Sequence, residues 1–94
     1  MPLYTTLLKY TAEGFKGISQ DRLQQNIRMI ESKGGKFVAG YGLMGEWDLL
    51  VITEFPDEQS AMRALLATCQ SGIGTTQTMT ALAIEDFVKL AQNP

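Results

Sequence analysis

The sequence predicts an α+β domain of βαββαβ type, in which two helices cover one face of a four-stranded antiparallel sheet and a short C-terminal helix follows. Three observations predict this fold. Strand-like and helix-like segments follow one another in the order β-α-β-β-α-β. A short turn joins the two central strands, so these strands form an antiparallel hairpin. Right-handed crossovers then place both helices on the same face of the sheet.

Residues 3–35 predict the first strand and the first helix. The threonine, tyrosine and leucine residues between positions 3 and 10 suit a pleated strand. Residues 13–17 contain two glycines and indicate a flexible connection. Ser19 is the expected N-cap of the helix, and the glycine pair at 34–35 ends it, because glycine readily adopts the left-handed conformation of a helix end. The apolar stripe of this helix contains Leu23, Ile27 and Ile30.

The central hairpin is predicted from residues 36–55. Its first strand spans 36–43, and a turn at 44–46 contains Gly45, which can adopt a positive φ. The strand from Trp47 to Phe55 carries the strongest strand signal in the chain, since it is rich in β-branched and aromatic residues. A fourth strand, rich in threonine, is expected over residues 75–83.

A second helix follows the hairpin, with Asp57 as its expected N-cap. Cys69, the only cysteine, falls on the apolar face of this helix, so we expect a small buried side chain rather than a reactive thiol. After the fourth strand, apolar residues between 84 and 91 predict a short C-terminal helix. The apolar face of the second helix consists of Ala61, Met62, Leu65, Leu66 and Cys69.

The predicted topology is that of a ferredoxin-like fold, which leaves one face of the sheet without helices. A sheet with one face in water alternates apolar and polar residues, but residues 49–52 are all aliphatic. We therefore expect a second copy of the chain to cover the open face, as a homodimer or a higher homo-oligomer. The pattern leaves open whether Leu49 and Val51, or Leu50 and Ile52, point outward.

Composition and charge exclude several classes of function. Eight basic and ten acidic residues give a net charge of −2, and the basic residues are scattered, so neither nucleic acid nor a membrane is expected as a partner. The chain has no histidine, which excludes a Ser-His-Asp triad and histidine-liganded haem or metal sites. We expect no metal and no cofactor. Since the N-terminus lacks the features of a signal peptide, we expect a cytoplasmic protein.

Residues 41–48 contain the candidate ligand-binding residues Tyr41, Gly45, Trp47 and Asp48. In a functional interpretation these residues form the mouth of a pocket, with an aromatic wall, a phenol donor and a carboxylate that accepts a hydrogen bond or a proton. In a structural interpretation the glycine makes the turn, Trp47 packs on the sheet and Asp48 accepts hydrogen bonds from backbone N–H groups. The sequence leaves both interpretations open.

The chain resembles the GYD family of small bacterial and archaeal proteins, which is named for a Gly-x-Tyr-Asp-like motif at the start of the third strand. The motif corresponds here to Gly45-Glu46-Trp47-Asp48, with tryptophan in place of tyrosine. Nearly the whole chain takes part in the resemblance. The further similar stretches are Leu7-Leu8, Tyr10-Thr11, Gly14, Gly34-Gly35-Lys36, Tyr41, Leu50-Val51-Ile52 and Pro56-Asp57.

The resemblance implies a dimeric α/β barrel, in which two ferredoxin-like sheets face each other. The wider superfamily includes cofactor-free monooxygenases, haem-using enzymes, isomerases and ligand-sensing domains. The turn at 45–48 is also similar to that in the sensing domains of leucine-responsive transcription regulators, although no helix-turn-helix accompanies it here.

Three functions remain open from the sequence for a single domain over residues 1–94. The first is a homo-oligomeric module that binds a small molecule or another protein. The alternative is a cofactor-free enzyme, monooxygenase-like or isomerase-like, which acts on a small organic substrate in a pocket near residues 45–48; Asp48 would be its base, and Trp47 and Tyr41 would shape the cavity. The third is an architectural subunit without a ligand. Whether the chain is an enzyme is not decided by the sequence.

Overall fold

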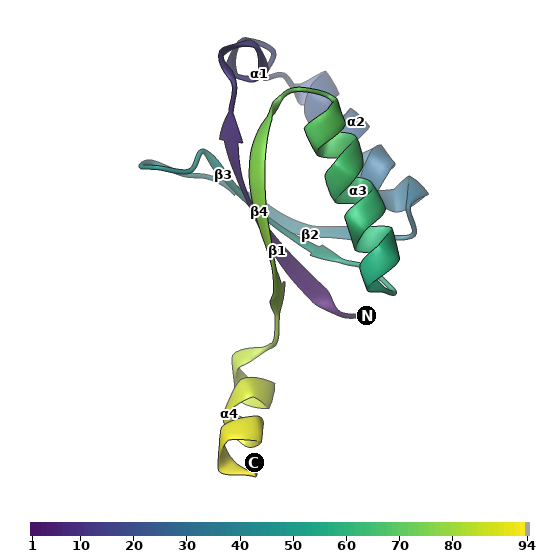
Figure 1. Cartoon of the computed structure of the whole chain (residues 1–94), viewed down its shortest axis with the longest axis vertical. Coiled ribbons are helices and arrows are strands. Elements are labelled where there is room, and N and C mark those ends of the chain that lie inside the picture. Colours follow the sequence, from purple (N-terminus) through teal and green to yellow (C-terminus); the bar gives the residue numbers. More distant parts are fainter. Residues whose placement is uncertain (94) are drawn as a thin grey trace.

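The structure, a computed structural model, describes residues 1–93 and contains the predicted elements in the predicted order (Figure 1). The strands are β1 (Leu3–Tyr10), β2 (Lys36–Gly42), β3 (Leu49–Glu54) and β4 (Gly74–Ala81). The helices are α1 (Ala12–Lys16), α2 (Gln20–Ser32), α3 (Glu58–Gln70) and α4 (Ile84–Gln92).

The four strands form one antiparallel sheet in the order β2-β3-β1-β4. This strand order and the βαββαβ chain order confirm the ferredoxin-like fold. Helices α2 and α3 lie on one side of the sheet, whereas α4 projects from the end of β4 away from the other elements (Figure 1). A bulge between Phe37 and Ala39 shifts the register of the β2–β3 pair.

Both long helices begin at the predicted N-caps. The Ser19 Oγ accepts a hydrogen bond from the Arg22 backbone N at 3.1 Å, and the Asp57 Oδ1 accepts one from the Ser60 backbone N at 2.8 Å. The bonds from Ser60 lower the pKa of the Asp57 carboxyl below its usual value, because they favour the charged form. Gly34 has φ +85, which ends α2 as expected from the glycine pair.

Two local predictions were wrong. Residues 12–16 form the helix α1 rather than a flexible connection, because the Thr11 side chain caps it through the Gly14 backbone N at 3.0 Å. Cys69 is exposed rather than buried. The buried face of α3 is centred on Ser60 and Ala64, so the helix is rotated relative to the expected face and turns Cys69 toward solvent.

The core lies between the sheet and the two long helices and is small. Its buried cluster is Tyr4, Ile30, Phe55 and Ala64, with Met29, Phe37 and Ala61 packed around it. The rings of Tyr4 and Phe55 meet edge to face at 6.0 Å between centroids.

The strand pairing decides which aliphatic residues of β3 point away from the helices. Leu49 is paired with Leu8 and Leu50 with Leu7; because Leu8 is buried beneath the helices, Leu49 lies on the helix side and Leu50 on the other. We call the side without α2 and α3 the open face. Its apolar residues are Leu3, Leu7, Ala39, Tyr41, Leu50, Ile52, Met79 and Ala81.

Candidate functional site

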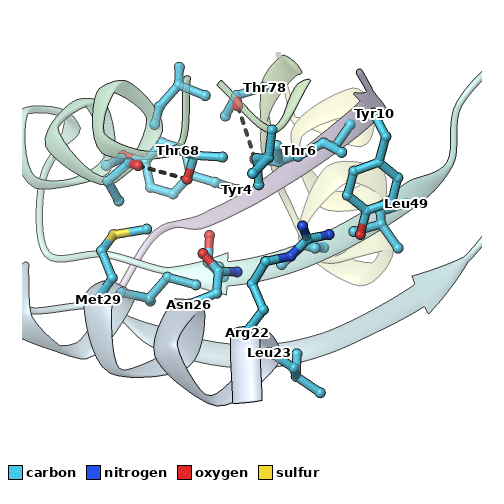
Figure 2. Close-up of a pocket in the computed structure, with 18 of the residues that line it drawn as sticks. Tyr4, Thr6, Tyr10, Arg22, Leu23, Asn26, Met29, Leu49, Thr68 and Thr78 are labelled. Carbon is cyan, nitrogen blue, oxygen red and sulfur yellow. Dashed lines mark hydrogen bonds between the residues drawn. The ribbon is translucent and has the colours of Figure 1, made fainter. Parts of the chain in front are cut away.

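A cavity of about 450 Å³ lies between the helix side of the sheet and the two long helices (Figure 2). Helix α2 packs beside β2 and helix α3 beside β4, so the central strands β1 and β3 form the floor between them. The face that α3 turns to this space carries small side chains, among them Ala61, Ala64 and Thr68, which leave it unfilled. Larger apolar side chains of the wall include Tyr4, Leu8, Met29, Val51, Phe55 and Leu65.

One part of the wall is polar and cationic. The Arg22 guanidinium lies over the ring of Tyr10, 5.3 Å from its centroid, and both residues line the cavity. Figure 2 shows Arg22 and Asn26 reaching from α2 toward the space above the sheet. Within residues 1–93, the only ion pair is that between Lys16 and Glu13, so Arg22 has no carboxylate partner in this part of the chain.

Other polar groups of the wall already bond one another. The Thr6 and Thr78 hydroxyls lie 2.9 Å apart across β1 and β4, and the Thr68 hydroxyl donates to the Ala64 carbonyl at 3.1 Å (Figure 2). Since these hydroxyls already have partners, Arg22 is the strongest donor left to face a ligand.

The structure places the four predicted site residues apart from this cavity, and none of them lines it. Tyr41 lies on the open face with 59% of its surface exposed, and Gly45 makes the exposed turn with φ +121. Trp47 is half-buried. Their grouping into a pocket mouth stays a prediction.

Asp48 does not line the cavity, but it is hydrogen-bonded to Tyr10, which does. Its Oδ2 accepts a hydrogen bond from the Tyr10 backbone N at 2.8 Å, and its own backbone N donates to the Leu8 carbonyl at 2.8 Å. Both bonds continue the β1–β3 pairing beyond its last paired residues, Leu8 and Leu49. Asp48 therefore fixes the end of the strand that carries the Tyr10 ring to the cavity wall.

The sequence interpretation missed Arg22 and Asn26, although it held a signal for them. These two residues and Ile30 recur every four positions, so they lie on one face of α2. Ile30 is the buried residue of this helix, whereas Leu23 of the predicted stripe is exposed. Because Arg22 and Asn26 share the helix face of the buried Ile30, this spacing indicates that their polar side chains point toward the core.

The described residues contain no group of three or more histidine, cysteine, aspartate or glutamate side chains that could hold a metal ion. Across positions 1–93, none of the helices has both the length and the apolar character that crossing a membrane requires.

Comparison with known proteins identifies the family. The model of the GYD domain matches residues 4–91. The chain belongs to the GYD family. This confirms the resemblance seen in the sequence. No functionally curated protein matches the chain significantly.

Solved structures of other proteins share the fold of this GYD chain. FFRP-DM1 is 21% identical with a TM-score of 0.62, and the match covers 87% of this chain and 100% of that one. The hypothetical protein PHS023 from Pyrococcus horikoshii is 21% identical with a TM-score of 0.61, covering 88% and 92%. The transcriptional regulator NMB0573 from Neisseria meningitidis, in complex with L-Met, is 17% identical with a TM-score of 0.57, covering 87% of this chain and 50% of that one.

Proposed function

We propose that this GYD-family protein is a self-associating module that binds a small organic molecule in the cavity between the sheet and helices α2 and α3. The cavity itself carries the proposal. Its volume of about 450 Å³ lies within the range of about 300–1,000 Å³ that is usual for ligand pockets, and its wall is mostly apolar with a few polar groups.

The polar groups indicate what kind of molecule fits. Arg22 is a planar cation without a carboxylate partner in residues 1–93, and its guanidinium can donate two parallel hydrogen bonds to a carboxylate. The apolar wall favours a hydrocarbon or aromatic body. We therefore expect a monocarboxylate with an apolar side chain. The L-Met complex of the Neisseria meningitidis regulator supports this expectation, since L-Met joins a carboxylate to an apolar side chain on a protein of the same fold.

The predicted site residues take a secondary place in this proposal. Asp48 positions Tyr10, whose ring supports the Arg22 guanidinium, through the 2.8 Å bond to the Tyr10 backbone N. Tyr41, Gly45 and Trp47 lie outside the cavity wall, and a ligand-binding role for them stays a prediction.

The open face supports self-association. Leu7, Leu50 and Ile52 lie on neighbouring strands of this face, and no helix of residues 1–93 packs over them. These three side chains are partly exposed, and Tyr41 and Met79 of the same face are exposed. An uncovered apolar face of this kind favours a protein interface, and a second copy of the chain is the simplest cover. We propose that two sheets meet through this face.

Thermal unfolding in the presence of carboxylates and their uncharged methyl esters tests the ligand proposal. The wild type should be stabilised more by branched or aromatic monocarboxylates than by their esters, because only the acids pair with Arg22. Arg22→Gln should lose this difference. Arg28→Gln is the matched control, since Arg28 is an exposed residue of the same helix and does not line the cavity.

The proposal fails if no carboxylate stabilises the wild type, or if both variants respond alike. Mass spectrometry of the recovered molecule separates binding from the enzyme alternative. An unchanged molecule supports a binding module, and a converted one supports catalysis.

A further inference from the structure

The C-terminal helix α4 has an apolar stripe that no other element of residues 1–93 buries. Its apolar residues recur at the spacing of one helical face, and its charged residues lie on the opposite face. None of its residues is buried; the exposed fractions in the stripe are 65% at Ile84, 59% at Phe87 and 44% at Val88. The stripe consists of Ile84, Phe87, Val88 and Ala91.

A helix of this kind needs a surface to pack against. It is only 9 residues long, whereas isolated helices shorter than about 12–15 residues are marginal in water. Its N-cap residue, Ala83, provides no side-chain hydrogen bond. Local interactions alone therefore give this helix little stability, and packing of the stripe must supply the rest.

The accessible surface of the chain exceeds that of a compact monomer by about the area that one partner buries in a protein interface. The accessible surface is 6453 Å² for a mass of 10.4 kDa. A compact monomer of this mass exposes about 5,400 Å², so the excess is about 1,000 Å². A standard interface buries about 800 Å² on each partner. The radius of gyration is likewise large, at 14.2 Å, against about 12 Å for a compact chain of this length.

The connection between β4 and α4 indicates that the stripe packs on a second copy of the chain rather than on the sheet of its own chain. Only Leu82 and Ala83 join the two elements, and Ala83 is extended, with φ −55 and ψ 140. Residues 80–84 contain no glycine, proline, asparagine or aspartate, the residues that reverse a chain within two positions. The helix accordingly continues past the end of the sheet (Figure 1).

The apolar surface of the open face continues along β4 to α4. Met79 and Ala81 lie on the open face of β4, Leu82 is exposed, and the stripe of α4 follows. A membrane surface is a poorer occupant, because helices that lie on membranes are rich in basic residues. Here Glu85 and Asp86 stand against a single basic residue, Lys89.

We propose that α4 is an exchanged arm: its apolar stripe packs on a second copy of the chain and extends the interface that the open face begins. This inference rests on the proposed self-association. Each chain then gives one arm and receives one, so the contact is doubled by the two-fold symmetry of a dimer.

The test compares two serine variants of α4 by analytical ultracentrifugation. Phe87→Ser removes the largest side chain of the stripe and should raise the dimer dissociation constant at least about tenfold, as for a buried aromatic anchor. Lys89→Ser, on the charged face, should leave the constant within about twofold. Equal constants for both variants and the wild type overturn the proposal.

Nuclear magnetic resonance of mixed dimers shows which chain the arm contacts. Isotope-filtered contacts between the Phe87 ring of a labelled chain and methyl groups of an unlabelled chain support exchange. Contacts only within one chain overturn the proposal. It is also overturned if the wild type binds vesicles of phosphatidylcholine and phosphatidylglycerol and Phe87→Ser abolishes that binding. A monomeric wild type refutes self-association as well, whereas a dimer unaffected by Phe87→Ser refutes the arm alone.

Discussion

Removal of the Asp48 carboxylate should destabilise the fold, because it leaves the end of β1 without a hydrogen-bond acceptor. Asp48 Oδ2 is 2.8 Å from the Tyr10 backbone N, in a part-buried position. A hydrogen bond to a charged group contributes about 1.5–3 kcal/mol, and a neutral one about 0.5–1.5 kcal/mol. Asp48→Ala should therefore lower the free energy of unfolding by about 2 kcal/mol. Asp48→Asn, which keeps an acceptor oxygen, should lower it by about 1 kcal/mol.

For a domain of this size, 1 kcal/mol corresponds to a shift of about 4–8 °C in the melting temperature. Circular dichroism at one fixed protein concentration should thus show a decrease of about 8–16 °C for Asp48→Ala and half of that for Asp48→Asn. Glu46→Ala is the control, because Glu46 is an exposed neighbour in the same turn and should change stability by no more than about 0.5 kcal/mol. Equal melting temperatures for Asp48→Ala and Glu46→Ala would refute this structural role.

Three further predictions follow from other parts of the chain. Gly14→Ala should cost about 1–3 kcal/mol in urea unfolding, because its Cβ would overlap the Ile73 carbonyl, whereas Gly42→Ala meets no atom within 4 Å and should be almost neutral. Leu50→Lys on the open face should give a monomer in light scattering, whereas the mass of the wild type should be that of a dimer or a multiple of it; a monomeric wild type contradicts the proposal. The pKa of the Asp57 carboxyl is lower in the folded chain, so its contribution to stability is present above the unfolded pKa and is lost as the pH falls through the folded pKa. Asp57→Asn should remove this pH dependence. Urea unfolding between pH 7 and 3 should show that the difference in unfolding free energy between wild type and variant shrinks below about pH 4.

Local chemistry in the sequence was enough to predict every element except α1, and their order. Ser19 and Asp57 were predicted as N-caps and act as such, because a cap needs only a short polar side chain and the N–H groups that follow it. The order of the elements, combined with right-handed crossovers, was enough for the sheet topology. Predicted strand ends differ from the structure by up to two residues, since the ends depend on pairing with other strands.

The residues that line the candidate cavity were not predictable in this way. Arg22 and Tyr10 come together only when α2 lies against the helix side of the folded sheet, and the space beside them exists because α3 presents small residues there. Asp48 and Tyr10 are 38 positions apart, so the bond between them has no local signal either.

The sequence by itself determined the four strands, the helices α2, α3 and α4, the residues at which the long helices begin, and that β3 is aliphatic on both faces. The tertiary structure decided that Leu50 rather than Leu49 points outward and that Cys69 is exposed. The physical reason is the same in each case. Periodicity gives the spacing of side chains along one element, but the direction in which a face points is set by pairing and packing with residues far away in the chain.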